Sequence, residues 1–264
     1  MAMMMINGKR TNVIQMNSEG KKTIVMIHGL FTSLSVYYFH IAPRLAKKYH
    51  VVLYDLRGHG LSEPCEELLN PKNLSEDLVA LMSVLKIEKA HVVGYSFGGG
   101  IALYTALHYP HLVECVTLID MPYLNEAEFS LLSDSDADFD FETEVKKHTQ
   151  STNIKIPDQV SRRTMTRLEK MFGDGKLTRI LIASRQILEA LPLTELKVPI
   201  LLLYGGKSPY LETGKRLQTM LQGARLRIGK GDHNIPVQSA LWVYWQLRNF
   251  SKKQLKGHEQ NETR

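Results

Sequence analysis

A short glycine-rich motif in the middle of the chain is the first candidate for chemistry. The residues GYSFG, Gly94–Gly98, place Ser96 between a strand-like run and a helix-like run. A serine in the pattern G-x-S-x-G must occupy a sharp, strained turn, and its neighbours two positions away must be nearly free of side chain. The N–H groups that begin the following helix would favour negative charge at this point. A turn of this type can also bind phosphate, or can need its glycines for the turn alone.

Three further polar segments follow predicted strands. They are IHGL at residues 27–30, YDLRGHGLS at 54–62 and GKGDHNIP at 229–236, the last of which contains His233. His233 follows the last predicted strand and comes after Ser96 in the chain, whereas His28 belongs to the HG turn. The histidines that lie on predicted helices or at the starts of strands are His40, His50, His91, His108 and His111.

The elements that must position these motifs alternate between strand and helix. Strand-like runs cover residues 11–16, 21–29, 50–56, 90–96, 112–120, 198–206 and 224–233. Helix-like runs cover residues 35–49, 73–87, 97–110, 210–221 and 239–250. This alternation predicts an α/β fold with a mostly parallel sheet and helices on both of its faces. Ligands of such sheets bind at the carboxyl ends of the strands, which is where the polar segments lie.

The alternation stops after Asp120 and resumes near Pro199. The intervening residues contain an acidic cluster, DSDADFDFETE, and two helix-like stretches. We therefore predict a core of residues 1–120 and 194–250, a helical lid insert of residues 121–193, and a flexible basic tail of residues 251–264.

The order of these motifs, from about Thr23 to Phe250, resembles the α/β-hydrolase superfamily. The resemblance implies a mostly parallel central sheet flanked by helices, with a helical lid insert. It implies that Ser96 is the nucleophile and that His233 is the general base, which takes the Ser96 proton and returns it to the leaving group. It also implies an oxyanion hole formed by the backbone N–H groups of Leu30 and Phe97. The RGHG segment at residues 57–60 matches a structural turn in this family.

The family pattern is broken at the third member of the triad. Most members carry an Asp or Glu in the loop after the penultimate strand, and this sequence has Ser208 there, within GGKSPY. A serine cannot stabilise a positive imidazole as a carboxylate does. Three explanations remain open. Asp120, which ends the preceding strand, could be a relocated acid, as in thioesterases of polyketide and peptide synthases. Asp232 or Glu212 could assist His233, or no acid is used and Ser96 is slow or inert.

Composition narrows the classes of function. The chain has 264 residues with a net charge of +6, and no apolar run approaches the roughly 20 residues that span a bilayer. Part of the basic excess lies in the C-terminal tail, and no basic stripe interleaved with aromatic residues is present, so we expect no nucleic-acid partner. Cys65 and Cys115 are too few for a disulfide framework, which favours a reducing cytoplasm. The N-terminal residues MAMMMINGKR lack the long apolar segment and cleavage site of a signal peptide, so we expect none.

We therefore predict a serine hydrolase that cleaves an ester or thioester through an acyl-enzyme, with Ser96 as nucleophile, His233 as base and Asp120 as acid. It would need no cofactor or metal, and its substrate would be a small acyl compound. If Asp120 is the acid, the similarity to synthase thioesterases makes an acyl carrier protein a partner to consider. The alternatives are a lyase, cyclase or C–C hydrolase on the same fold, or a catalytically weak binding protein.

Overall fold

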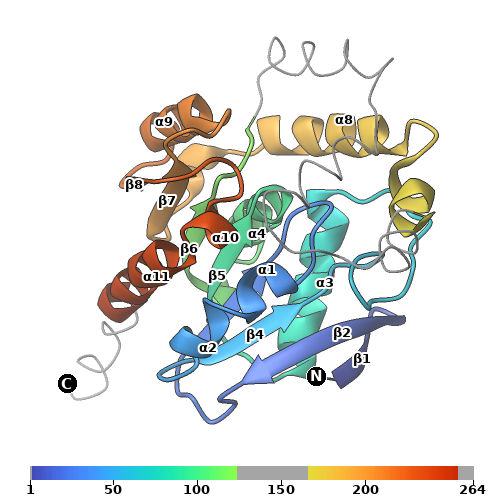
Figure 1. Ribbon diagram of the computed structural model, residues 1–264, viewed down its shortest axis with the longest axis horizontal. Coiled ribbons are helices and arrows are strands. Elements are labelled where there is room, and N and C mark those ends of the chain that lie inside the picture. The colour runs from blue at the N-terminus through green and yellow to red at the C-terminus, as the bar shows by residue number, and fades with distance from the viewer. Residues whose placement is uncertain (1, 124–165, 255–264) are drawn as a thin grey trace.

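A computed structural model describes residues 2–123 and 166–254 of the chain (Figure 1). Within these residues one sheet of eight strands runs through the molecule. The strands are β1 (Ala2–Ile6), β2 (Lys9–Met16), β3 (Thr23–Ile27), β4 (His50–Tyr54), β5 (Ala90–Tyr95), β6 (Val113–Ile119), β7 (Ile200–Gly205) and β8 (Arg225–Gly229).

The sheet has the spatial order β1-β2-β4-β3-β5-β6-β7-β8. β2 is antiparallel to both β1 and β4, and the strands from β4 to β8 are parallel. Because these strands are parallel, all of their carboxyl ends face the same edge of the sheet, and crossover connections return the chain to the opposite edge. The loops after β3, β4, β5, β6, β7 and β8 therefore converge on the edge of the carboxyl ends. They are the loops that carry the polar motifs of the sequence.

Helices cover both faces of the sheet and separate the hydrophobic core into two layers. One layer contains side chains from α3, α4, α8 and α9, and the other contains side chains from α1, α2, α10 and α11. The described helices include α1 (Ser35–Tyr38), α2 (Ala42–Leu45), α3 (Pro71–Val84), α4 (Phe97–His108), α8 (Lys176–Glu189), α9 (Leu211–Met220), α10 (Ile235–Gln238) and α11 (Ala240–Gln254), with short 3₁₀ turns at Pro110–Leu112 and Leu193–Glu195.

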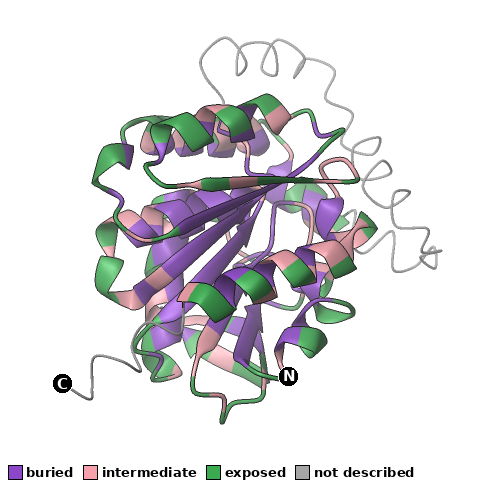
Figure 2. Cartoon of the chain, turned by 90° about the vertical axis from the view of Figure 1, so that its left-hand side faces the viewer, coloured by how far each residue is buried: buried purple, intermediate pink, exposed green. Residues whose placement is uncertain are grey.

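The central strands are buried on both faces (Figure 2). Along β3, Val25 and Ile27 enter one core layer while Ile24 and Met26 enter the other, because successive side chains of a strand point to opposite faces. A strand buried on both faces must be apolar throughout, which explains the unbroken runs of Val, Ile and Leu in the sequence.

Local signals account for most helix boundaries, and one predicted helix is divided. α3 is capped by Asn70, whose side chain accepts a hydrogen bond from the Asn73 N–H, and Pro71 is its first residue. The helix expected over residues 35–49 is instead two four-residue helices, α1 and α2. Pro43 lies in the first turn of α2, where its missing N–H has no helical partner to lose.

The two ends of the described chain differ from the prediction. Residues 2–6 form the edge strand β1, which the sequence did not indicate because Met3 and Met5 are more than half exposed and break the apolar alternation. At the other end α11 continues to Gln254, so residues 251–254 belong to the core domain and not to a flexible tail. Ser251 is buried there, and its hydroxyl contacts Nδ1 of His91 at 2.8 Å.

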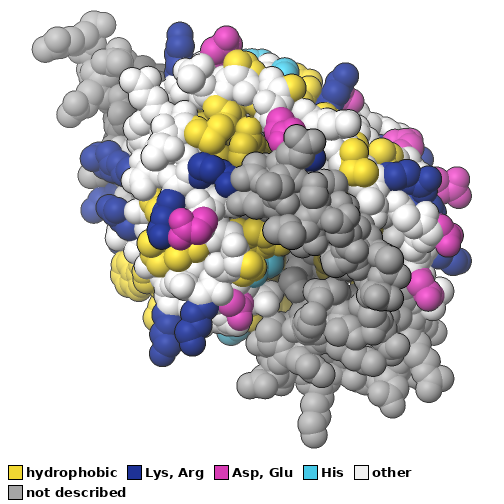
Figure 3. All heavy atoms as spheres, turned by 90° about the horizontal axis from the view of Figure 1, so that it is seen from above, with side chains coloured by type: hydrophobic (Ala, Val, Ile, Leu, Met, Phe, Trp, Pro, Cys, Tyr) yellow, Lys and Arg dark blue, Asp and Glu magenta, His cyan; other side chains and the backbone are white. Residues whose placement is uncertain are grey.

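Much of the predicted lid insert, residues 124–165, lies outside the described residues, as does the tail from residue 255. The described part of the insert is helical at residues 166–172 and in α8. Figure 3 looks onto the end of the molecule where α8 lies. On the described surface of that end, Lys and Arg side chains are interspersed with Asp and Glu. None of the described helices is both long and apolar enough to cross a membrane.

Three buried histidines should make folding sensitive to acid. Burial lowers the pKa of His28 to about 4 and that of His59 and His91 to about 3, from an ordinary value of 6.5. A histidine that is kept neutral in the folded state takes up its proton on unfolding below pH 6.5. Its contribution to stability is therefore complete above that pH and is lost as the pH falls toward the folded pKa.

We expect His91→Gln to reduce this acid sensitivity, because an amide can still pair with Ser251 and Thr117 but does not titrate. Between pH 6 and 4.5 the free energy of unfolding of the wild type should fall more steeply than that of the variant, by up to about 1.4 kcal/mol per pH unit. Urea unfolding at several pH values measures the slope. The matched control is His40→Gln at an exposed position, which should keep the wild-type slope; equal slopes for all three proteins would contradict the prediction.

Candidate active site

Ser96 occupies a strained turn between β5 and α4. Its backbone has φ +51° and ψ −122°, a conformation that a residue with a side chain rarely adopts. The turn is held from beneath by a hydrogen bond of 2.9 Å from the Ser96 N–H to the carbonyl of Ile119, the last residue of β6. The side chain is partly exposed and lies at the carboxyl edge of the sheet.

The glycines around Ser96 are explained by close approach of backbone. A Cβ on Gly94 would lie 2.2 Å from the carbonyl oxygen of Gly98, and a Cβ on Gly98 would lie 2.6 Å from the carbonyl oxygens of Ile27 and His28. A Cβ on Gly29 would lie 2.9 Å from the Cβ of Ser96. Real Cβ atoms do not approach so closely. The HG and G-x-S-x-G motifs can therefore pack against each other only if these three positions are glycine.

Ser96, His233 and Asp120 form a continuous chain of hydrogen bonds. The Nε2 atom of His233 lies 3.0 Å from the Ser96 hydroxyl, and its Nδ1 atom lies 2.8 Å from Oδ2 of Asp120. The three residues follow β5, β8 and β6 respectively, so the parallel register brings them to one edge of the sheet. Of the carboxylates weighed from the sequence, Asp120 contacts the ring. Asp232 instead accepts hydrogen bonds from the Asn234 N–H and the Gln238 amide.

The Asp120 carboxylate is fully buried and accepts hydrogen bonds from three donors. Besides His233, the N–H of Gly205 donates to Oδ1 at 2.8 Å and the Ser208 hydroxyl donates to Oδ2 at 2.5 Å. A buried carboxylate needs such partners to offset its desolvation. Because a carboxylate can only accept, Nδ1 of His233 must carry a proton, and Nε2 is left as the acceptor that faces Ser96.

The two N–H groups predicted for an oxyanion hole flank Ser96. Phe97 follows the serine directly, and Leu30 follows Gly29, which packs on the Ser96 Cβ. Among residues 2–123 and 166–254 neither N–H has a protein acceptor, as a pair of donors kept for a ligand requires.

His28 holds the Leu30 loop in place. Its Nδ1–H donates to the Gly29 carbonyl at 2.8 Å, while Nε2 accepts from the N–H of Leu56 at 3.0 Å. The lowered pKa of this buried ring, about 4, keeps it neutral at ordinary pH, as both contacts require. His28 therefore connects the Leu30 loop to the turn after β4.

The RGHG turn is a structural support, fastened by an arginine that the sequence analysis did not identify. The guanidinium of Arg167 donates to the carbonyl oxygens of Gly58, Gly60 and Ser62, with a distance of 2.8 Å to Gly58. Arg167 lies in the helix at residues 166–172, so these bonds attach the described part of the insert to the core. No spacing rule links an arginine to carbonyl groups more than a hundred residues away.

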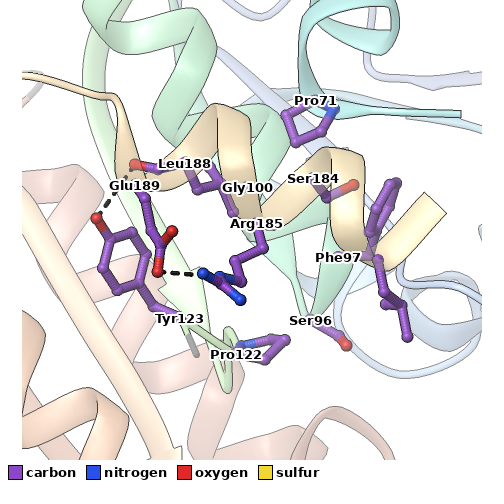
Figure 4. A pocket seen from close by; sticks show the side chains of 11 residues that line it. Pro71, Ser96, Phe97, Gly100, Pro122, Tyr123, Ser184, Arg185, Leu188 and Glu189 are labelled. Atoms are coloured by element: carbon purple, nitrogen blue, oxygen red, sulfur yellow. Dashed lines mark hydrogen bonds and ion pairs between the residues drawn. The ribbon is translucent and has the colours of Figure 1, made fainter. Parts of the chain in front are cut away.

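A small pocket opens beside Ser96, beneath α8 (Figure 4). It has a volume of about 60 Å³, and most of its lining side chains are apolar. An ion pair of 3.1 Å between Arg185 and Glu189 lines one side, and the buried hydroxyl of Ser184 lines another. The remaining lining residues are Pro71, Phe97, Gly100, Pro122, Tyr123, Leu181 and Leu188.

The fold and the motifs define the class of protein. Residues 22–147 match the family model of the alpha/beta hydrolase fold. An enol-lactonase from Burkholderia xenovorans has a similar crystal structure, with a TM-score of 0.73, 20% sequence identity, and coverage of 95% of this chain and 100% of that chain. The chain belongs to the α/β-hydrolase superfamily, and its eight-stranded, mostly parallel sheet with flanking helices is the fold that the sequence predicted.

Similarity to curated proteins covers only part of each relative. The chain is 34% identical to a dihydrolipoyllysine-residue acetyltransferase component of an acetoin cleaving system from Pseudomonas putida, over 46% of this chain and 33% of the relative. It is 33% identical to an sn-1-specific diacylglycerol lipase from Danio rerio, over 55% of this chain and 42% of the relative. The match thus spans less than half of the length of each of these proteins.

Proposed function

We propose that this protein is a serine hydrolase that cleaves an ester or thioester of a short acyl group through an acyl-enzyme. The observation that carries the proposal is the continuous hydrogen-bond chain from the Ser96 hydroxyl through His233 to the buried Asp120 carboxylate. These hydrogen bonds give the base an orienting acid, although Ser208 occupies the usual position of that acid. It favours an enzyme over the alternative of a catalytically weak binding protein.

The residues would divide the chemistry as follows. The Ser96 oxygen attacks the acyl carbon while its proton passes to Nε2 of His233, and Asp120 stabilises the imidazolium. The N–H groups of Leu30 and Phe97 hold the charge that develops on the carbonyl oxygen. The leaving alcohol or thiol takes the proton from Nε2. Water then repeats the sequence on the acyl-enzyme and regenerates the serine.

The similar proteins support acyl chemistry in general. The names of those described above refer to an acetyltransferase component, a diacylglycerol lipase and an enol-lactonase. All three names concern acyl–oxygen or acyl–sulfur bonds, which matches the reaction class proposed here. Hydrolysis and transfer differ in whether water or an alcohol attacks the acyl-enzyme, so both products should be measured.

The proposal is tested by covalent labelling. A fluorophosphonate probe should add to Ser96 of the wild type, and intact-mass and peptide analysis should locate the adduct there. Ser96→Ala should remain unlabelled and should lose hydrolysis of p-nitrophenyl acetate. Adding ethanol and measuring the ethyl ester separates acyl transfer from hydrolysis. A wild type that neither reacts with the probe nor cleaves short esters would refute the hydrolase proposal.

Asp120→Asn should lower kcat on the same ester by about three to four orders of magnitude. An amide has only one oxygen acceptor, and its NH2 group can donate to Nδ1, which would place the ring proton of His233 on Nε2, the wrong tautomer. The matched control is Asp232→Asn, next to His233 in sequence but without a hydrogen bond to its ring, which should stay within about twofold of the wild type. A large loss in the control with little loss in Asp120→Asn would assign the acid to Asp232.

The pocket volume predicts a preference for short acyl chains. A cavity needs about 10–15 Å³ of such space to hold one water, so a volume of about 60 Å³ corresponds to about four to six waters, which suits a short acyl chain. A methyl at Gly100 would lie 3.2 Å from a Leu188 methyl and would narrow the pocket. Gly100→Ala should therefore reduce kcat/KM for butyrate more than for acetate, by about fivefold or more, without a loss of thermal stability because alanine favours the α4 helix. An unchanged acetate-to-butyrate ratio would contradict this placement of the acyl chain.

A further inference from the structure

The hydroxyl of Ser208 lies between two groups of the site. Ser208 is buried, with 8% of its surface exposed. Its Oγ–H donates to Oδ2 of Asp120 at 2.5 Å, and its Oγ accepts from the N–H of Tyr210 at 3.0 Å. The oxygen that it contacts is the same Oδ2 that accepts the Nδ1–H of His233.

The direction of the Ser208 proton follows from these partners. A hydroxyl can donate one hydrogen bond and accept others. The Tyr210 N–H can only donate and the Asp120 carboxylate can only accept, so the proton must point at Asp120. These two neighbours therefore fix the direction of the Ser208 hydroxyl.

We propose that Ser208 is a positioning residue for His233 that acts through Asp120. It fixes Oδ2 in the place from which the carboxylate orients the ring, and it shares the negative charge of that oxygen. This inference rests on the proposed function, because Ser208 would support the acid of the same hydrolytic site.

Tyr210 extends the same arrangement to the ring itself. Its aromatic ring meets His233 edge-on, with centroids 4.9 Å apart and an interplanar angle of 75°. Tyr95 packs near the ring as well, with centroids 5.3 Å apart. The Ser208 hydroxyl therefore holds both the carboxylate that binds Nδ1 and the backbone of the residue that packs against the ring.

Two measurable effects follow from loss of the hydroxyl. Without it, Oδ2 is held by His233 alone, so the carboxylate can turn and the ring is oriented less firmly, which lowers kcat. In addition, the charge of Oδ2 is no longer shared with Ser208 and binds the protonated ring more tightly. Proton loss from the ring then requires a higher pH, so the acidic limb of the kcat/KM profile should move upward.

The other titratable groups around Asp120 and His233 should not obscure this shift. Tyr95 of β5 and Tyr204 of β7 have a pKa raised by burial, and they stay neutral through the acidic limb. Partial burial of Asp232 raises its pKa, but hydrogen bonds from Gln238 and Asn234, together with the nearby charge of His233, outweigh this effect and keep the pKa below its ordinary value. Asp232 is therefore already charged in the pH range of interest. Tyr210 also packs against the ring.

The test compares Ser208→Ala with the wild type on p-nitrophenyl acetate from pH 5 to 9. Removing one hydrogen bond to a charged group should lower kcat by about 10-fold or more, with KM within about twofold. The acidic limb of kcat/KM should move up by about half a pH unit or more. Ser208→Thr keeps the hydroxyl and should restore most of kcat and the original limb. The matched control is Ser239→Ala, whose hydroxyl contacts the Lys230 carbonyl away from Asp120 and which should match the wild type.

The outcomes separate this inference from the proposed function. If the wild type cleaves the ester and Ser208→Ala has the same kcat and the same acidic limb, the inference is overturned and the hydrolase proposal stands. A loss of kcat with an unmoved limb, or one that Ser208→Thr does not restore, also overturns it, because it indicates a structural role. A folded wild type that does not react at Ser96 refutes the proposed function itself. Thermal unfolding of each variant shows that the comparison is made on folded protein.

Discussion

The arrangement of this site depends on one buried carboxylate. Asp120 is fully buried, and it accepts hydrogen bonds from the Gly205 N–H, the Ser208 hydroxyl and Nδ1 of His233. These donors belong to the end of β7, the loop that follows it and the loop after β8. Pairing of β7 with β8 and the backbone hydrogen bonds between the loops after them already bring these segments together, and the carboxylate adds a shared acceptor whose desolvation the three donors offset.

The parallel register explains why an acid at this position can reach His233. Ile119, the last residue of β6, pairs with Tyr95 of β5 on one side and with Leu203 of β7 on the other. Residues that leave these neighbouring strands therefore lie side by side at the same edge. An acid after β6 and an acid after β7 approach the ring from adjacent loops. In this chain the loop after β7 supplies a hydroxyl that binds the acid in place of a second carboxylate.

The sequence predicted the elements best where pattern and chemistry coincide. Buried strands such as β3 were identified because burial on both faces requires continuous apolar residues, and the turn at Ser96 because its glycines are required sterically. The edge strand β1 was missed because its exposed methionines are not held by core packing. The end of α11 was placed too early because lysines at residues 252 and 253 resemble a tail, whereas the buried contact of Ser251 with His91 extends the helix.

The sequence by itself determined the family, the parallel sheet, and the candidates Ser96 and His233, because these depend on local patterns and on the order of motifs. It left open which carboxylate faces His233, since Asp120, Asp232 and Glu212 all lie near strand ends or loops and differ only in where their side chains point. Tertiary structure decided that question, because hydrogen bonding needs atoms within about 3 Å and only the packed strands fix positions so closely. It also changed the meaning of Ser208, from the residue that replaces an acid to the donor that binds one.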